Sequence, residues 1–328
     1  MNNEQTRRCF VTGGSGFIGR KLIDVLVRQG YAVRVLTRHK NRGFPVGVRV
    51  VLGDLASVGC HLSESLEGCT VIFHCAGEVR DVAAMRSLHI DGTKFLIQAV
   101  LKEAERRKQS IHWVQLSSVG AYGPIQGMAH AERIVTEDTP VHPVGEYEIT
   151  KTISDELVLD AGKNGLLSCS IVRPSNVIGA NMSNQSLYSL GRMVEKGLFF
   201  YIGPPGAIAT YIHVDDVVEV LIRCSVDPRA KGKTFNISND CLLEEMIEGM
   251  AKSLGVTCPK LRVPVSLARV IARAASKIVP IPLTQGRINA LVARTRYPYS
   301  KLERELNFSP SISISHAIGE VVLAKQGL

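Results

Sequence analysis

Short apolar runs and segments with helical spacing alternate along the first half of the chain. β-branched and aromatic residues dominate five runs that we predict to be β-strands, at residues 8–12, 32–36, 49–52, 71–74 and 113–116. Apolar residues at helical spacing predict helices over 17–29 and 93–107, and Gly30 suits the end of the first helix. Strands separated by helices predict a parallel sheet with right-handed crossovers, the doubly wound α/β architecture.

The alternation loosens after about Gly179. The sequence Gly-Pro-Pro-Gly at 203–206 predicts a turn, an apolar helix is expected over 213–223, and a strand that returns to the sheet is expected over 234–238. Beyond about Leu242 the chain has two helical patterns and several prolines. We therefore expect a smaller C-terminal lobe beside the sheet.

Composition is typical of a folded globular protein. The 328 residues are 45% hydrophobic and 21% charged. The formal net charge of +9 suits phosphate-bearing ligands, but the basic residues are scattered and lack interleaved aromatics, so we predict no nucleic-acid partner. The eight cysteines form no Cys-x-x-Cys pair and lie mostly in apolar runs, which predicts buried, reduced thiols.

Neither a secretory signal nor a membrane span is expected. Residues 1–8 are polar and contain no apolar core of a signal peptide. The longest uncharged stretch, 111–131, is interrupted by glycines and a proline, so it is a poor candidate for a bilayer-spanning helix. These features predict a soluble, cytoplasmic protein.

Three glycines, Gly13, Gly16 and Gly19, lie between the first predicted strand and the first predicted helix. In a dinucleotide-binding loop the first glycine allows a tight turn, the second lets the backbone approach a pyrophosphate, and the third lets helix and strand pack closely. The anion then lies against the free amides of a helix N-terminus. Such a triplet elsewhere is an ordinary turn, but its position here predicts dinucleotide binding.

The end of the second predicted strand bears on the choice of dinucleotide. An acidic side chain there would bind the ribose hydroxyls of NAD, whereas this chain has Thr-Arg-His-Lys at 37–40. Arg38 therefore favours the 2′-phosphate of NADP, with NAD and a merely solvated loop end as the alternatives. Asp54, after the third strand, would accept a hydrogen bond from the adenine amino group or would cap the following turn.

Tyr147 and Lys151 are four residues apart and so share one face of a helix. A nearby ammonium and a cationic nicotinamide would both stabilise the phenolate form of Tyr147, whose ordinary pKa is near 10. Tyr-x-x-x-Lys strings are common on surface helices, but Ser118 follows the fifth predicted strand, at the sheet edge where ligands bind. We predict that Ser118, Tyr147 and Lys151 are catalytic and that the chain has no metal site.

These segments occur in the order found in extended short-chain dehydrogenases/reductases, and the chain resembles the NAD-dependent epimerase/dehydratase family over nearly its whole length. The segments that carry the resemblance are Thr12-Gly13-x-x-Gly16-x-x-Gly19, Gly53-Asp54-Leu55, His74-Cys75-Ala76-Gly77, Ser117-Ser118, Tyr147-x-x-x-Lys151, Arg173-Pro174-Ser175-Asn176 and His213-Val214-Asp215-Asp216. The resemblance implies that Tyr147 is the acid/base, that Lys151 holds the ribose and lowers the pKa of Tyr147, and that Ser118 orients the substrate. It also implies a cofactor site made by Thr12, Gly13, Gly16, Phe17, Ile18, Gly19, Arg38, Asp54, Leu55, Cys75, Ala76, Gly77, Tyr147, Lys151 and Pro174, with Asn176 contacting the substrate.

Two positions depart from the family pattern. Relatives usually carry Asn where this chain has His89, which either substitutes for that asparagine or is a satisfied core histidine. Relatives that act on nucleotide sugars often have an Arg just before the Val-Asp-Asp string, where this chain has Ala209-Thr210-Tyr211. The second departure weakens the expectation of a nucleotide-sugar substrate.

A basic stripe made by Arg269, Arg273 and Lys277 is predicted on a helix over 265–277, opposite the apolar Leu267, Val270, Ile271 and Ala274. We interpret the stripe as the solvated face of a packed helix, with a wall of a phosphate-binding pocket as the second interpretation.

The function expected from the sequence is NADP-linked reduction, or epimerisation, of a nucleotide-sugar ketone with Tyr147 moving the proton. The first alternative is a reductase or dehydrogenase of an apolar ketone or alcohol, and an alternative of another class is a non-catalytic NADP-binding redox sensor. We expect a dinucleotide-binding Rossmann domain over 1–178 to which 212–240 returns, and a substrate lobe formed by 179–211 and 241–328. Relatives are often dimeric, so a homodimer is expected.

Overall fold

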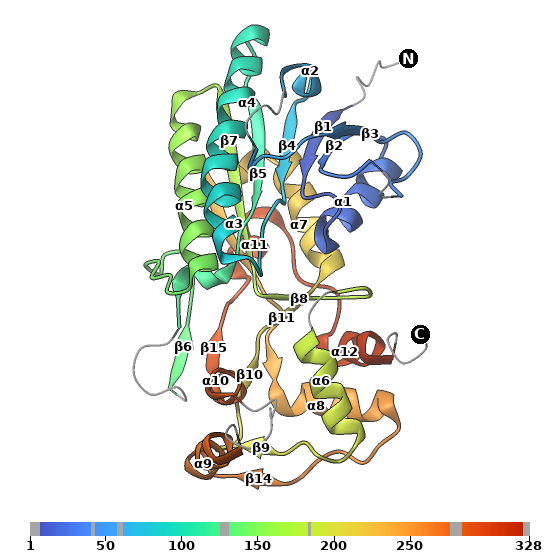
Figure 1. Ribbon diagram of the computed structural model, residues 1–328, viewed down its shortest axis with the longest axis vertical. Coiled ribbons are helices and arrows are strands. Elements are labelled where there is room, and N and C mark those ends of the chain that lie inside the picture. The colour runs from blue at the N-terminus through green and yellow to red at the C-terminus, as the bar shows by residue number, and fades with distance from the viewer. Residues whose placement is uncertain are drawn as a thin grey trace.

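A seven-stranded parallel sheet forms one end of the protein (Figure 1). The structure is a computed structural model, and it describes residues 7–40, 43–57, 62–124, 131–182, 185–275 and 284–323. Across the sheet the strands are β12 (Lys233–Ile237), β7 (Leu167–Pro174), β5 (Ile111–Leu116), β4 (Val71–His74), β1 (Arg8–Thr12), β2 (Ala32–Thr37) and β3 (Arg49–Leu52). The order reverses between β1 and β4, which confirms the doubly wound, Rossmann-like fold class.

Helices cover both faces of the sheet because successive strand residues point to opposite sides. On one face, Cys9 and Val11 of β1 pack in a cluster with α1 (Phe17–Arg28), α7 (Val214–Val226) and α11 (Ser300–Leu306). On the other, Phe10 and Trp113 pack in a cluster with residues of the remaining sheet helices. Those helices are α2 (Ser63–Leu66), α4 (Thr93–Arg107) and α5 (Glu146–Ala161).

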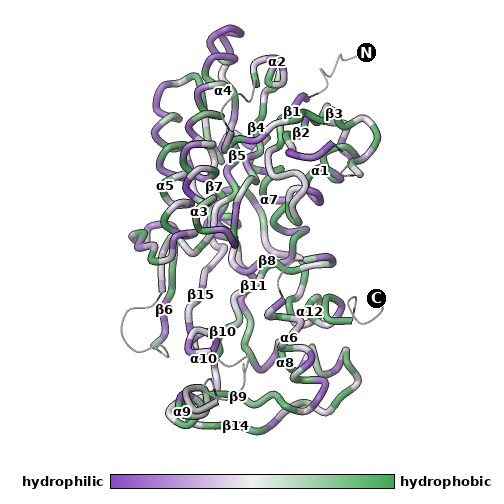
Figure 2. Tube along the Cα trace, in the orientation of Figure 1, coloured by the Kyte–Doolittle hydropathy of each residue, from purple (hydrophilic) through white to green (hydrophobic). Residues whose placement is uncertain are grey.

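A smaller lobe lies beyond the carboxyl ends of the strands (Figure 1). Its larger hydrophobic cluster joins α6 (Gln185–Glu195), α8 (Leu243–Leu254) and α12 (Ile314–Leu323), and Figure 2 shows α12 as largely hydrophobic. A smaller cluster joins α9 (Val265–Ala275) and α10 (Gln285–Val292). Four two-stranded sheets complete this part: β8 (Asn176–Ile178) with β11 (Tyr211–His213), β9 (Tyr201–Ile202) with β14 (Arg262–Val263), β10 (Ile208–Ala209) with β13 (Cys241–Leu242), and β6 (Glu132–Ile134) with β15 (Arg294–Arg296).

Three of the short helical segments in the connections of the sheet lie near the candidate site. α3 (Val82–Arg86) runs into a π-helical turn, Ser87–Gly92, that leads directly into α4. A 3-10 turn, Val119–Tyr122, follows β5. The π-helical turn contains one residue of the candidate site described below, and another caps the 3-10 turn.

The five strands and two helices expected in the first half are present within two residues of their predicted bounds. The sequence pattern missed β7, in which Ser168 and Ser170 interrupt the apolar run, although the strand is buried between β5 and β12. It indicated two helical patterns beyond about Leu242, where the described chain has five helices. Helices of 7 to 12 residues hold only two or three turns of periodicity, which prolines and turns then interrupt.

Every cysteine in the described part of the chain is free, and Cys9, Cys69, Cys169 and Cys224 are buried. Cys60 lies outside the described residues. Within the same ranges, no helix has both the length and the apolar character needed to cross a bilayer.

Candidate active site

The glycine loop between β1 and α1 has the geometry that its spacing predicts. Gly13 has a φ of +69°, and a side chain there would overlap the carbonyl of Cys75. A side chain on Gly19 would overlap the carbonyl of Gly13, so the helix can pack against the loop only with glycine at this position. Gly16 caps α1 with no side chain, which leaves the first amides of the helix facing an open cleft.

A cleft of about 340 Å³ opens beside this loop. It brings together nine of the residues predicted to contact a cofactor, namely Thr12, Gly13, Gly16, Arg38, Asp54, Leu55, Cys75, Ala76 and Gly77. Phe17 instead lines another cavity, Ile18 packs against the core, and Gly19 is buried. Pro174 is buried at the end of β7 and is also not part of the cleft wall.

Three charged side chains line the cleft. Arg38 is exposed, and Asp54 accepts a hydrogen bond from the Ala56 amide at 3.0 Å, as expected for an aspartate that caps a turn. Glu78 was missed by the sequence analysis, although it directly follows the Cys-Ala-Gly segment. It accepts the amide of Arg80 at 2.7 Å, and chiefly this bond lowers the pKa of the Glu78 carboxyl, with a smaller contribution from Arg38.

Helix α5 carries Tyr147 in its first turn and Lys151 in its second. The Lys151 ammonium is buried and donates a hydrogen bond to the carbonyl of Leu116, at the end of β5, at 2.7 Å. Burial lowers the pKa of Lys151, and the carboxylate of Asp155, one turn further along α5, opposes that shift. Two ammonium hydrogens of Lys151 remain available for a ligand.

Tyr147 is half-buried, and its phenol is protonated at neutral pH. Burial raises the pKa of Tyr147 to about 12, with smaller contributions from the neighbouring carboxylates of Glu148 and Asp155. Lys151 is not among the groups that shift this pKa in the protein alone. The phenol is therefore a proton donor in the absence of a cofactor.

Ser118 caps the 3-10 turn after β5. Its Oγ accepts a hydrogen bond from the Gly120 amide at 3.0 Å, so its own hydroxyl hydrogen is free to be donated to a ligand oxygen. The preceding Ser117 donates to the buried carboxylate of Asp155 at 2.6 Å, and Arg173 of β7 bonds the same oxygen at 3.1 Å. These contacts tie the ends of β5 and β7 to α5.

His89, in the π-helical turn, is a satisfied core histidine. Its Nε2 accepts the amide of Glu78 at 2.8 Å, which fixes Nδ1 as the donor to the hydroxyl of Thr150, also at 2.8 Å. Burial lowers the pKa of His89 to about 4, so the ring is neutral. The ring also lies edge-on to Tyr147, with the ring centroids 5.7 Å apart. His89 thereby joins the cleft beside the glycine loop to the helix that carries Tyr147.

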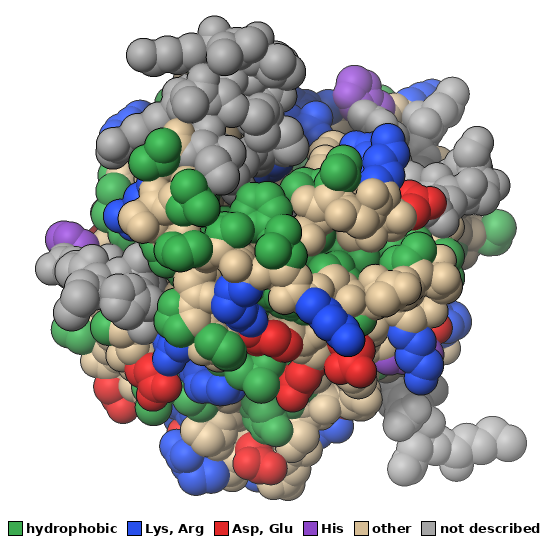
Figure 3. Space-filling model, turned by 90° about the horizontal axis from the view of Figure 1, so that it is seen from below, with side chains coloured by type: hydrophobic (Ala, Val, Ile, Leu, Met, Phe, Trp, Pro, Cys, Tyr) green, Lys and Arg blue, Asp and Glu red, His purple; other side chains and the backbone are tan. Residues whose placement is uncertain are grey.

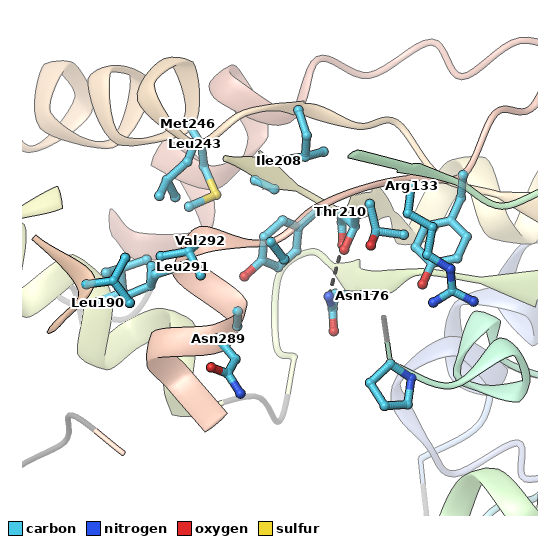
Figure 4. Close-up of a pocket in the computed structure, with 18 of the residues that line it drawn as sticks. Arg133, Asn176, Leu190, Ile208, Thr210, Leu243, Met246, Asn289, Leu291 and Val292 are labelled. Carbon is cyan, nitrogen blue, oxygen red and sulfur yellow. Dashed lines mark hydrogen bonds between the residues drawn. The ribbon is translucent and has the colours of Figure 1, made fainter. Parts of the chain in front are cut away.

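A second cavity, of about 860 Å³, lies between the 3-10 turn and the smaller lobe. Gly123 and Pro124, which follow the turn capped by Ser118, form part of its wall. Figure 4 shows Leu190, Leu243, Met246, Leu291 and Val292 together on one side of the cavity and Arg133, Asn176 and Thr210 on the other. The cavity thus has an apolar region and a polar region.

Asn176, predicted to contact the substrate, lines this second cavity. Its side-chain amide donates to the carbonyl of Thr210 at 2.9 Å, as drawn in Figure 4. The carbonyl oxygen of the Asn176 side chain is left for other partners.

The prediction that the basic residues of the helix over 265–277 form a solvated face is wrong for Arg269. Arg269 lines this same cavity. The apolar Leu267 and Val270, expected to pack inward, are instead 47% and 60% exposed, while the small Ala268 and Ala272 are buried. Arg273 and Lys277 belong to the same predicted stripe, but the side chain of the first and the whole of the second lie outside the described residues. Helix α9 packs through its alanines because these allow a close approach to α10.

Comparison with known proteins decides the family. The model of the NAD dependent epimerase/dehydratase family matches residues 9–238, which is more than two thirds of the chain. The protein belongs to this family. The resemblance inferred from the motifs is thereby confirmed, as is the expectation of an enzyme that uses a nicotinamide dinucleotide.

The family member described here has curated relatives that cover almost its full length. It is 26% identical to the 3beta-hydroxysteroid-dehydrogenase/decarboxylase isoform 1 of Arabidopsis thaliana, over 97% of this chain and 80% of the relative. It is 27% identical to the decarboxylating sterol-4-alpha-carboxylate 3-dehydrogenase of Mus musculus, over 97% of this chain and 91% of the relative. Among solved structures, UDP-glucuronic acid 4-epimerase from Bacillus cereus in complex with NAD superposes with a TM-score of 0.73 at 18% identity, covering 97% and 99% of the two chains. The last comparison shows a shared fold.

Proposed function

We propose that this member of the family is a reductase or dehydrogenase that interconverts a ketone and a secondary alcohol on a large, mainly apolar substrate. The observation that carries the proposal is the row of Leu and Met side chains along the cavity beside the Ser118 turn (Figure 4). Burying an apolar scaffold there would contribute about 25 cal/mol for each Å² removed from water. The full-length similarity to sterol dehydrogenases supports the same substrate class.

The residues of the site fit proton transfer at an oxygen. In the direction of reduction, the Ser118 hydroxyl donates a hydrogen bond to the substrate carbonyl, and the protonated Tyr147 phenol supplies the proton that converts it to an alcohol. A bound nicotinamide supplies the hydride. Lys151, fixed by the Leu116 carbonyl, would present its remaining ammonium hydrogens to the cofactor ribose, and the cationic nicotinamide left after hydride transfer would stabilise the phenolate of Tyr147.

The cofactor in this proposal is NADP, held in the cleft beside the glycine loop. Arg38 is the exposed cation at the end of β2, where a 2′-phosphate would lie, although NAD stays the alternative. Thr12, Leu55 and the Cys75–Gly77 segment would line the adenosine and nicotinamide halves. The same proposal assigns 1–178 with 212–240 to cofactor binding and 179–211 with 241–328 to substrate binding.

A thermal-shift panel with NADP present tests the substrate class. Steroid ketones and alcohols should raise the melting temperature, since a ligand at 100 times its Kd stabilises the fold by about 2.7 kcal/mol. UDP and dTDP should leave it nearly unchanged. Stabilisation by the nucleotides alone would contradict an apolar substrate, and tight NADP binding without oxidation of NADPH by any ketone would favour the non-catalytic sensor.

A nucleotide sugar, the substrate expected first from the sequence, is the second candidate. Asn176 favours it, because Asn176 lines the cavity and the matching asparagine of the family commonly contacts the substrate nucleotide. Against it, Ala209 and Thr210 line the region where relatives acting on nucleotide sugars often carry an arginine. The same thermal-shift panel separates the two candidates.

A further inference from the structure

The charged groups in the wall of the substrate cavity are all of one sign. Among the described residues that form this wall, Arg133 and Arg269 are charged and none is acidic. Neither arginine forms an ion pair with a carboxylate of the described chain. Such a wall gives the cavity a positive potential that apolar surroundings strengthen, because the local dielectric constant is low.

The two arginines differ in how they are held. Arg133, on β6, donates to the carbonyls of Gly123 and Tyr122 at 2.8 and 2.9 Å, so its guanidinium is partly satisfied. The Nε of Arg269, on α9, is buried and has no hydrogen-bond partner among the residues that the structure describes. A guanidinium donor removed from water and left unpaired carries a free-energy cost, which an anionic acceptor would offset.

We propose that the cavity binds a substrate that joins an apolar scaffold to an acid group, and that Arg269 is the anchor for the acid. A carboxylate or phosphate would accept hydrogen bonds from the planar fork of the Arg269 guanidinium, while Leu190, Met246 and Val265 would bury the scaffold. Arg133 adds to the potential from the end of the cavity near the Ser118 turn. This inference rests on the proposed function, since it specifies the substrate class of that site.

The test compares an acid with its neutral ester. Lithocholic acid, its methyl ester and UDP are titrated calorimetrically into the full-length protein with NADP present. We expect the acid to bind at least about tenfold more tightly than the ester, in line with hydrogen bonds to charged groups. In Arg269→Gln the preference should disappear while the affinity for the ester stays unchanged. Arg269→Lys should retain part of the preference for the acid.

A matched control is Arg28→Gln, because Arg28 is exposed at the end of α1 and lines none of the cavities described above; it should leave the preference intact. Equal binding of acid and ester by the unaltered protein would overturn the role of Arg269 as the anchor and leave the proposed apolar substrate standing. A preference for the acid that survives in Arg269→Gln would have the same two consequences. Binding of UDP alone, lost in Arg269→Gln, would support the anchor and overturn the apolar function. If UDP alone binds and does so undiminished in Arg269→Gln, or if no probe binds, both proposals fail.

Discussion

At the scale of single residues, the candidate site contains the hydroxyl groups of Ser118 and Tyr147, and the surroundings of each determine which proton it can donate. The Ser118 oxygen accepts from the Gly120 amide, and the Ser118 hydrogen stays available for a ligand oxygen. Burial keeps Tyr147 protonated, with a pKa raised to about 12, and the neutral ring of His89 packs edge-on against it. The sequence could supply these residue types and their order, but not the protonation states, because those depend on burial.

Arg38→Ala should separate the two dinucleotides. Loss of a guanidinium from the 2′-phosphate should raise the Kd for NADPH by roughly tenfold to a hundredfold, in line with hydrogen bonds to charged groups, and should leave the Kd for NADH nearly unchanged. Fluorescence titration of the reduced cofactors measures both constants. Arg28→Ala is the matched control, because Arg28 does not line the cleft. An equal change for NADPH and NADH would contradict a role in phosphate binding.

At the scale of elements, close packing makes the cleft. The N-terminus of α1 approaches the loop after β1 only because Gly19 has no side chain. The π-helical turn places His89 between the Glu78 amide and Thr150 of α5, so the cofactor cleft and the helix of Tyr147 share one hydrogen-bonded link. Neither the close packing at Gly19 nor the link through His89 has a periodic sequence signal. From the sequence, His89 could be interpreted either as a substitute for the family's asparagine or as a core histidine, and only its hydrogen-bond partners decide between them.

Gly19→Ala should disrupt the cofactor loop. The added methyl group would overlap the carbonyl of Gly13, so the loop and α1 must move apart, and we expect a loss of about 1 to 3 kcal/mol in the free energy of unfolding, as for overpacking in cores. NADP affinity should fall as well. Gly286→Ala is the control: this glycine of α10 is exposed, and the nearest atom to an added Cβ is the Thr284 Oγ1 at 4.0 Å, an ordinary contact, so alanine should stabilise the helix slightly. Urea unfolding measures both, and unchanged stability in Gly19→Ala would contradict the packing.

Buried neutral histidines should make the fold sensitive to acid. Burial lowers the pKa values of His89 and His112 to about 4, below the ordinary 6.5 of the unfolded chain. The unfolded chain therefore binds more protons between pH 6.5 and 4, so the contribution of each histidine is complete above pH 6.5 and is lost as the pH falls through 4. Each contributes on the order of 3 kcal/mol to this loss.

Urea unfolding at a series of pH values measures this dependence. His89→Asn should flatten the slope between pH 6.5 and 4, although it lowers stability at neutral pH by breaking the two hydrogen bonds of the ring. The exposed His316 offers the control, and His316→Asn should leave the slope as it is. A slope that is identical in the two variants would contradict a buried neutral His89.

At the scale of the whole molecule, the sheet apart from β7 could be predicted from sequence, whereas of the lobe only its presence could be predicted and not its elements. Strong apolar runs and the glycine loop determine the doubly wound half, since the inner strands of the sheet are buried on both faces. The lobe uses short helices and two-residue strands whose partners are distant in sequence, such as β10 with β13. For the same reason the sequence placed Arg269 on a solvated face, whereas tertiary packing brings it to the cavity.

The central claim is that Tyr147 transfers a proton during NADP-linked interconversion of a ketone and an alcohol on an apolar scaffold. The most direct test follows NADPH oxidation at 340 nm, the cofactor's usual absorbance wavelength, with a steroid ketone as substrate, in the unaltered protein and in Tyr147→Phe. The account predicts turnover in the unaltered protein and a loss of about 100-fold to 10,000-fold in kcat in the variant, with the Kd for NADPH nearly unchanged. Retained turnover in Tyr147→Phe would contradict it.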